Sequence, residues 1–429
     1  AIPYNFLLQP EDLIYITKDA GIDSIIVDSV FIKPETIPFL QTFKNIIVVG
    51  PTDPIKIGNN SLSYKTFLAN ADCTKAKVQH EKLDSIPDII LYTSGTTAKP
   101  KGVMLDESQF FANSQDTLTH IPITRDDRVI VALPLFHSFG NIMAMMVFMT
   151  GGTLILLKQF APKSILHNIE EHKATILPLV PTIYSFLIDL YARGNYDVSS
   201  LKYCISGGAA LPHSLLKKVE ETLQVSVIEG YGLTETSPVI AVNTFKDGSF
   251  PGSVGPVIPN LKLKIIDEAG NEKVSGEVGE IVVRGKTVMQ GYWNLPKETA
   301  KTITSDGWLK TGDLGHLDKE NRLFISAGRK KDLIIRAGEN ISPLAIENTL
   351  MNHPAIAEVA AVGISDERAG ERVKVFIVLR TDATTTESEL KSFCRKNLPA
   401  FMVPDHFQIM EELPKNATGK ILKNELKKN

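Results

Sequence analysis

The sequence predicts an α/β protein: a large N-terminal domain of parallel sheets with crossover helices, which includes a β-rich subdomain, followed by a small, mobile α+β domain. Through the first half, short apolar runs alternate with amphipathic stretches, which is the pattern of parallel strands joined by helices. After about Val239, turns and short alternating strands replace that pattern. We therefore expect the N-terminal domain over residues 1–329, its β-rich subdomain at about 240–328, and the C-terminal domain over residues 330–429.

The individual elements follow from apolar periodicity and from the turn residues between them. Residues 139–157 approach the length of a membrane span, but Gly151 and Gly152 divide them, so we expect a buried helix, a turn and a buried strand. The C-terminal part predicts a helix, two strands and a second helix. The expected strands are 24–28, 45–50, 88–94, 128–135, 153–157, 174–180, 202–208, 358–364 and 373–380, and the expected helices are 10–21, 161–174, 182–194, 211–224, 343–356 and 388–398.

Composition and charge argue against several classes of protein. The 429 residues include 46 basic and 49 acidic side chains, a formal charge of −3, which gives no general basic field for nucleic acid. The 3 cysteines lie far apart without a CxxC pair, which predicts neither a disulfide framework nor a zinc site. We expect a reducing, cytoplasmic setting, no secretory signal and no transmembrane span.

The stretch LYTSGTTAKPKGVML, residues 91–105, places small hydroxyl side chains and two lysines directly after an apolar strand. Such loops offer backbone N–H groups, hydroxyls and positive charge, and phosphate is their natural ligand. A solvated turn of ordinary loop residues is the alternative.

Two familiar phosphate motifs do not fit. Pro100 stands where the P-loop needs its second glycine, and GYGLTE, residues 230–235, ends in glutamate where the dinucleotide motif needs glycine.

Four further stretches follow this loop along the chain: GYGLTET (230–236), TGD (311–313), GRKKDLI (328–334) and PKNATGKI (414–421). In this order, the five stretches resemble the signatures of the adenylate-forming superfamily, which includes acyl-CoA synthetases, aryl-CoA ligases, luciferases and non-ribosomal adenylation domains. The resemblance extends from near residue 1 to the end of the chain. It implies that ATP and a carboxylic acid form an acyl-adenylate and pyrophosphate, and that a thiol then displaces AMP.

The resemblance implies a phosphate site and its metal. Joining two anions requires that charge at the phosphates be neutralised. Glu235 would hold Mg²⁺, because a hard cation prefers carboxylate oxygen, and Thr234 would reach the α-phosphate; a solvated loop acid is the alternative for Glu235. The residues implied to hold the β- and γ-phosphates are Thr93, Ser94, Gly95, Thr96, Thr97 and Lys101.

The resemblance implies the adenosine site in the same way. Tyr231 would stack on adenine, and a buried core tyrosine is the alternative. Asp313 would accept hydrogen bonds from both ribose hydroxyls, and Arg329 would donate to the same sugar. The other positions implied to bind AMP are Gly207, Gly208, Ala209 and Gly232.

Four residues are implied to act in catalysis or in domain movement. His137 would lie at the acyl tunnel, more as a steric gate than as a proton carrier, and a core histidine satisfied by hydrogen bonds is the alternative. Lys420 would bridge the attacking carboxylate and the α-phosphate. Lys331 falls at the hinge about which the small domain rotates between half-reactions. Gly338 would then line the pantetheine path, where glycine allows a close approach.

The sequence departs from the family pattern in two places. Ala98 stands where the family usually has glycine, and at a position with positive φ an alanine costs on the order of 1 kcal/mol. Family members also carry a further segment before the region that residues 1–28 resemble. We expect exposed apolar sheet edges, association or low stability, and weak activity without that segment.

We expect a ligase that uses ATP, Mg²⁺ and CoA to activate a medium- or long-chain fatty acid. PLFHSFG, residues 134–140, fits acyl or aryl ligases better than amino-acid adenylation domains. Acyl transfer to a carrier-protein phosphopantetheine is the alternative within enzymes, and an inactive nucleotide-binding remnant is the alternative outside them. A homodimer is a further option for the assembly.

Overall fold

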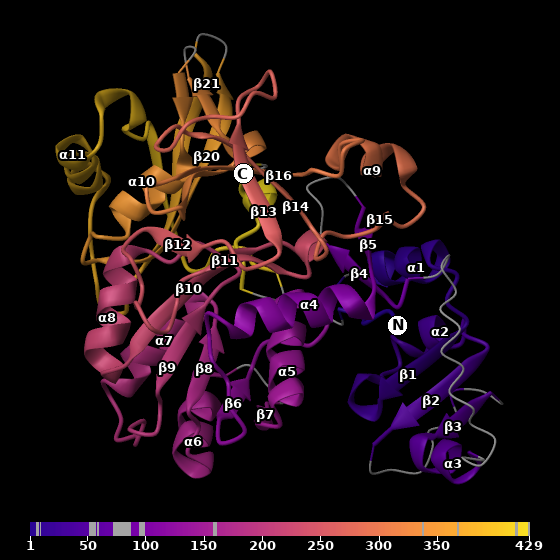
Figure 1. Cartoon of the computed structure of the whole chain (residues 1–429). Helices are drawn as coiled ribbons and strands as arrows, with labels where there is room; N and C mark the ends of the chain where they lie inside the picture. Colours follow the sequence, from indigo (N-terminus) through magenta and orange to yellow (C-terminus); the bar gives the residue numbers. More distant parts are fainter. Residues whose placement is uncertain are drawn as a thin grey trace.

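The computed structural model confirms the α/β class, with several sheets in the larger N-terminal part and an α+β arrangement at the C-terminal end (Figure 1). It describes residues 1–429 except 6–7, 9, 51–56, 58–59, 72–86, 94–98, 158–160, 337–338, 367–368, 417–418 and 428–429. Separate hydrophobic clusters fill an N-terminal lobe, the main body and the C-terminal part. The exact limits of the predicted domains stay predictions.

A six-stranded sheet lies at the centre of the main body, in the order β11-β10-β9-β8-β6-β7. Its neighbours are parallel except β10 and β11, as the alternation of strands and helices predicts. Apolar side chains of the flanking helices pack into the core, as in α8. The bounds are β6 (Arg128–Val131), β7 (Thr153–Leu156), β8 (Ile176–Leu179), β9 (Tyr203–Ser206), β10 (Ser226–Gly232), β11 (Val239–Val242), α4 (Glu107–Leu118), α5 (Ser138–Thr150), α6 (Pro162–His172), α7 (Pro181–Tyr191) and α8 (His213–Leu223).

The apolar run at residues 139–157 forms the predicted helix, turn and strand. α5 ends at Gly151, whose φ of 72° is the left-handed conformation that favours glycine after a helix. Strand β7 is at the edge of the sheet and Leu156 is 54% exposed, so the expected burial of this strand is wrong. Apolar composition does not reveal which strand ends a sheet. Among the described helices, none is both long and apolar enough to cross a membrane.

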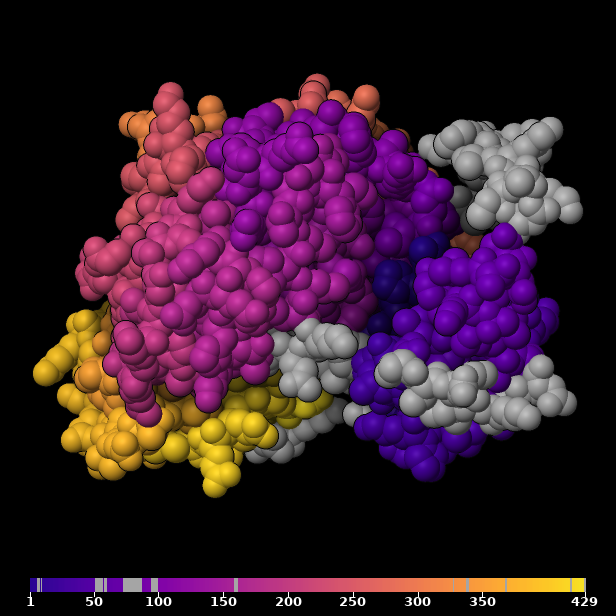
Figure 2. Space-filling view, turned by 90° about the horizontal axis from the view of Figure 1, so that it is seen from below, coloured from indigo at the N-terminus to yellow at the C-terminus, as the bar shows by residue number. Residues whose placement is uncertain are grey.

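The first part of the chain forms a lobe beside the main body, seen as the indigo residues in Figure 2. Its sheet consists of three parallel strands in the order β1-β2-β3. A small core that includes Phe43, Ile46 and Val48 packs inside this lobe. The bounds are α1 (Pro10–Asp19), β1 (Ser24–Asp28), η1 (Ser29–Phe31), α2 (Ile37–Leu40), β2 (Asn45–Val49), β3 (Ser61–Ser63) and α3 (Tyr64–Ala69).

The N-terminal part of the chain contains two further sheets. The predicted β-rich region is an antiparallel sheet in the order β12-β17-β16-β14-β13. A smaller sheet pairs β15 with the hairpin β4–β5, so residues 291–292 pack beside the segment 101–105. The bounds are β4 (Ile89–Thr93), β5 (Lys101–Leu105), β12 (Ser253–Pro256), β13 (Leu261–Ile266), β14 (Gly279–Gly285), β15 (Gly291–Tyr292), α9 (Pro296–Thr302), β16 (Leu309–Leu317) and β17 (Arg322–Arg329).

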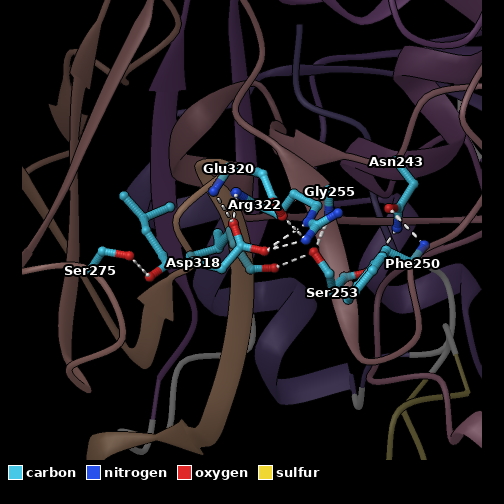
Figure 3. A network of polar contacts seen from close by, with 10 residues as sticks. Asn243, Phe250, Ser253, Gly255, Ser275, Asp318, Glu320 and Arg322 are labelled. Atoms are coloured by element: carbon cyan, nitrogen blue, oxygen red, sulfur yellow. Dashed lines mark hydrogen bonds and ion pairs between the residues drawn. The ribbon is translucent and has the colours of Figure 1, made fainter.

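A polar network surrounds the start of β17 (Figure 3). Arg322 donates a hydrogen bond of 2.7 Å to Asp318 and also pairs with Glu320. Its guanidinium carbon lies 3.7 Å from the centre of the Phe250 ring, a cation–ring contact. Because β12 pairs with β17 at this point, the network helps to fix the strand whose other end carries Arg329.

The C-terminal part is a five-stranded sheet with helices packed against it. Strands β19, β18, β21 and β20 follow one another, and β22 pairs in parallel with β21. Ile346, Ile356 and Val375 belong to its own hydrophobic cluster. The bounds are η3 (Lys330–Asp332), β18 (Ile334–Arg336), β19 (Glu339–Ile341), α10 (Pro343–Leu350), β20 (Ile356–Asp366), β21 (Gly370–Leu379), α11 (Glu387–Asn397), η4 (Ala400–Met402), β22 (His406–Met410) and α12 (Lys423–Leu426).

Candidate active site

The candidate site lies where the carboxyl ends of the parallel strands meet. His137 follows β6, Val180 follows β8, Gly207 follows β9, and Tyr231 is near the end of β10. Since β10, β9, β8 and β6 are consecutive in the sheet, these residues lie along one edge. Open α/β sheets bind their ligands at this edge. The fold thus gathers three stretches that the sequence singled out separately.

Gly232 is placed where no side chain fits. A Cβ at this position would lie 2.0 Å from the carbonyl oxygen of Pro238, because the chain turns tightly through η2 (Thr234–Thr236). The hydroxyl of Thr234 lies 3.3 Å from that of Ser138, at the start of α5. The GYGLTET stretch therefore contacts the PLFHSFG stretch directly.

The segment after β9 presents backbone to the same edge. A Cβ at Gly207 would lie 3.2 Å from the ring of Phe139, so a larger residue would press against α5. Gly208 has a φ of 80°, which favours glycine, and Ala209 follows it with an exposed side chain. This geometry suits the close backbone approach that the resemblance implies for adenine.

Glu229 was not among the predicted site residues. It lies in β10, opposite Ser206 of β9, and is 7% exposed. Its Oε1 accepts a hydrogen bond of 3.0 Å from the backbone N–H of Leu211. Burial raises the pKa of this carboxyl to about 7. The buried carboxyl group of Glu229, two residues before Tyr231, thus binds the backbone at the end of the segment 206–211.

Asp313 connects the predicted nucleotide residues. The Tyr231 hydroxyl donates to Oδ2 over 2.6 Å, and Arg329 Nε pairs with Oδ1 over 2.9 Å. Asp313 and Arg329 are register partners on β16 and β17, and Asp313 is 5% exposed. Burial, followed by the charge of Asp313, raises the pKa of Tyr231. The proposed adenine and ribose residues therefore form one hydrogen-bonded group.

The predicted metal residue has an aromatic partner. The hydroxyl of Tyr292, in β15, donates to Glu235 Oε1 over 2.9 Å. The ammonium of Lys101 lies 5.1 Å from the centre of the Tyr292 ring and 2.9 Å from Glu298 of α9. The ammonium groups of Lys301 and Lys101 lower the pKa of Glu298 to about 2. The loop lysine and the metal carboxylate are thus linked through Tyr292.

A cavity of about 270 Å³ opens beside these residues. Glu235 and Tyr292 line it together with Lys301, Thr311 and Arg329. Glu280 and Lys310 also line it, so its walls carry two carboxylates and three cations next to the nucleotide residues, which suits a ligand of several phosphates with a metal ion.

The predicted phosphate loop is described in part. Thr93 ends β4 and pairs with Lys101 at the start of β5. Ser94, Gly95, Thr96 and Thr97 lie outside the described residues, as do Ala98 and Gly338, so their roles stay predictions.

Lys420 belongs to the C-terminal part of the chain, and its charge interacts with those of Arg329 and Asp313. It lies in a hairpin closed by an antiparallel bridge between Lys415 and Ile421. Its side chain stays accessible, yet protein surrounds it enough that burial, followed by the charge of Arg329, lowers the pKa of Lys420. Burial, followed by the charge of Lys420, lowers the pKa of His137 to about 4.

His137 and Lys331 have defined local positions, and their predicted roles at the acyl tunnel and the hinge stay predictions. His137 is the N-cap of α5: its Nδ1 accepts from the backbone N–H of Phe139 over 3.3 Å. A neutral imidazole with Nδ1 as acceptor follows from that bond and from the low pKa. Lys331 is in η3, between the β-rich sheet and the C-terminal sheet.

Two family models match the chain. The model described as AMP-binding enzyme covers residues 1–293, and the model described as AMP-binding enzyme C-terminal domain covers residues 345–420. The chain belongs to the AMP-binding enzyme family. The match agrees with the order of the five stretches and with the group formed around Asp313.

Relatives of this AMP-binding enzyme cover nearly its whole length. The long-chain-fatty-acid–CoA ligase of Bacillus subtilis (strain 168) is 37% identical over 447 residues, which is 98% of this chain and 80% of the relative. ATP-bound MatB from Rhodopseudomonas palustris gives a TM-score of 0.89 at 30% identity, over 100% of this chain and 83% of MatB. Apo MatB gives 0.75 at 29% identity, with the same coverage. The chain thus spans about four fifths of these proteins and is more similar to the ATP-bound form.

The residues of this AMP-binding enzyme fit Mg²⁺ and ATP. In its described part, no group of three acidic, histidine or cysteine side chains could hold a metal alone. Mg²⁺ is commonly held by one or two carboxylates together with substrate phosphates and water, and Glu235 beside the cavity supplies such a carboxylate.

Two residues of the site, Glu229 and Tyr292, were not predicted, although the sequence carries a signal for each. Glu229 is a charge inside an apolar run, directly before GYGLTET, and a buried charge needs a partner. Tyr292 belongs to GYW, where glycine and two aromatic residues interrupt the β-rich region. Neither signal says which residue the side chain contacts, since both partners are distant in sequence.

Proposed function

We propose that this chain is an ATP-dependent acid–thiol ligase, which converts a carboxylic acid to acyl-AMP and then transfers the acyl group to CoA. The observation that carries the proposal is the group around Asp313, whose carboxylate binds Tyr231 and Arg329 beside the cavity. The charge of Lys420 acts on Asp313, Arg329 and His137. These residues are assigned to the ribose and to the acyl group. A cation between them can offset both anions of the adenylation step.

In adenylation, the carboxylate oxygen forms a bond to the α-phosphorus while the bond to pyrophosphate breaks. We assign Tyr231 to adenine, Asp313 and Arg329 to the ribose, and Lys101 with the loop 93–97 to the β- and γ-phosphates. Thr234 would reach the α-phosphate. Glu235 would hold Mg²⁺, which when bound neutralises phosphate charge. The chain's own part is to orient the two anions and to add the charge of Lys420.

In the second step, the thiol sulfur bonds to the acyl carbon and AMP leaves. We propose that the C-terminal part, residues 330–429, rotates about Lys331 between the steps. Because η3 lies between two sheets with separate cores, a change of φ and ψ there would leave both intact. The rotation would withdraw Lys420 and bring Gly338 to the pantetheine path.

His137 is proposed to act by its shape. Its imidazole is neutral near pH 7, since its pKa is about 4, and Nδ1 is occupied by the backbone of α5. A neutral ring next to the meeting point of acyl group and thiol supports steric gating over proton transfer.

A medium- or long-chain fatty acid is the proposed substrate, supported by the name of the Bacillus subtilis relative. A carrier-protein phosphopantetheine is the alternative acceptor. We also propose a homodimer, a cytoplasmic location, and the limits 1–329 and 330–429 for the two domains.

The test is acid-dependent exchange of labelled pyrophosphate into ATP, with a panel of fatty acids from short to long. We expect exchange that requires Mg²⁺ and is strongest with medium or long chains. Absence of exchange with every acid would refute ligase activity and favour a nucleotide-binding remnant. Product analysis with CoA against a phosphopantetheinylated carrier protein then identifies the acceptor.

A further inference from the structure

Helix α7 presents one row of side chains away from the main body. Its apolar side chains pack into the core, whereas Thr182 and Asp189 are partly exposed and Phe186 is 47% exposed. Spacings of four and three residues place these three side chains on the same face of a helix. We call Thr182, Phe186 and Asp189 the α7 strip.

Two members of the α7 strip contact the hairpin that carries Lys420. The hydroxyl of Thr182 lies 3.5 Å from the carbonyl oxygen of Gly419, the residue directly before Lys420. The ammonium of Lys415, on the opposite arm, lies 5.7 Å from the centre of the Phe186 ring. Both arms of the hairpin therefore meet the same helix.

The third member, Asp189, binds cations from both parts of the chain. Lys218 of α8 lies 2.9 Å from Oδ1, and Arg380, directly after β21, lies 3.5 Å from Oδ2. One carboxylate thus connects the main body with the C-terminal part. Replacing Arg380 removes only the ion pair between the two parts, and replacing Lys218 removes only the ion pair within the main body.

We propose that the α7 strip is a docking surface for residues 330–429, and that Thr182, Phe186 and Asp189 position Lys420 for adenylation. The inference rests on the proposed function and adds the residues that hold the first arrangement. All three contacts are of weak kinds: a long hydrogen bond, a partly exposed cation–ring contact and a partly exposed ion pair. Weak contacts suit an interface that forms for one half-reaction and separates for the other.

The first test compares Phe186→Ala and Arg380→Gln with two matched controls. Phe148→Ala removes a phenylalanine that is 69% exposed at the end of α5, and Lys218→Gln removes the other bond of Asp189. In single-turnover assays we expect Phe186→Ala and Arg380→Gln each to slow adenylation about threefold and the double variant about tenfold, as weak contacts predict. Acyl transfer from preformed acyl-adenylate to CoA should stay normal, and both controls should resemble the wild type.

Equal slowing of both half-reactions, or the same slowing in the controls, would overturn the docking role. A second measurement needs no activity: Asp189→Cys combined with Arg380→Cys is treated with a short bifunctional thiol reagent, and the linked peptides are measured by mass spectrometry. We expect an intramolecular link well above that of either single variant, and an equal yield would overturn the proposal. If the wild-type chain shows no acid-dependent exchange of pyrophosphate, the proposed ligase function is refuted. The cross-link still tests separately whether residues 330–429 dock on the α7 strip.

Discussion

Glu229 has its carboxyl group inside the sheet, and its hydrogen bond to Leu211 links β10 to the segment after β9. Burial raises its pKa from 4.5 to about 7. Between those values the folded chain holds a proton that the unfolded chain releases. The contribution to stability is therefore full below about pH 4.5 and is lost as the pH rises through 7.

Glu229→Gln should remove this pH dependence. The free energy of unfolding of the wild type should lose on the order of 3 kcal/mol relative to the variant between pH 4.5 and 7.5. The lowered pKa of His137 acts in the opposite direction but is present in both proteins, so it cancels in the difference. Urea unfolding of both proteins at several pH values measures the difference between their free energies of unfolding. If this difference stays constant across the range, the raised pKa of Glu229 is contradicted.

Tyr292 acts on another charge of the site, because its hydroxyl donates to the proposed metal carboxylate of Glu235. Tyr292→Phe should weaken the apparent affinity for Mg²⁺ about tenfold, since partners that orient a metal ligand contribute this much. Titration of Mg²⁺ in the exchange assay measures the change. Tyr203→Phe is the matched control, since it loses a hydroxyl bond of 2.8 Å to Pro122. Equal Mg²⁺ requirements in both variants would remove Tyr292 from the metal site.

At the scale of elements, the hairpin β4–β5 and helix α9 meet at the pair of Lys101 and Glu298. Lys101→Ala should raise the KM for ATP at least tenfold and leave the KM for fatty acid nearly unchanged, because phosphates are the proposed ligand. Lys99→Ala is the control, since Lys99 lies over the ring of Tyr15 in α1 instead. Unchanged ATP binding by a folded Lys101→Ala would refute the phosphate assignment.

Elements were predictable where local signals were sufficient. Residues 24–28 form β1 and residues 161–174 contain α6, because periodicity and turn residues act over a few positions. Strand β10 was not expected, since its short apolar run leads into glycines that indicate a loop. The order of strands in a sheet is not local, so the exposed edge at β7 and the pairing of β15 with β5 could not be read from the sequence.

At the scale of the whole molecule, family motifs predicted which residues would gather at the site, and Tyr231, Asp313, Arg329 and Lys420 do lie together. Composition alone could not have predicted this, because lone charges are usually solvated. Contacts such as the α7 strip remained hidden, since ordinary Thr, Phe and Asp side chains carry no motif. These three side chains contact the C-terminal part only because the two separately packed parts of the chain lie against each other.

The proposed hinge gives a prediction at this scale. Lys331→Pro should slow thiol transfer at least tenfold while adenylation stays within about threefold, because proline fixes φ in η3 and hinders rotation. Single-turnover assays of each half-reaction measure both rates. Normal thiol transfer in this variant would place the hinge elsewhere or refute the rotation.

Lys420→Ala tests most directly whether the C-terminal part brings a cation to the reacting anions for adenylation alone. The measurement is the single-turnover rate of each half-reaction in the variant and in the wild type. We predict that acyl-adenylate formation falls by about two to three orders of magnitude, since an electrostatic contact in the transition state is lost. Preformed acyl-adenylate should still react with CoA at nearly the normal rate. Equal slowing of the two steps would show that Lys420 is structural and would refute its role in adenylation.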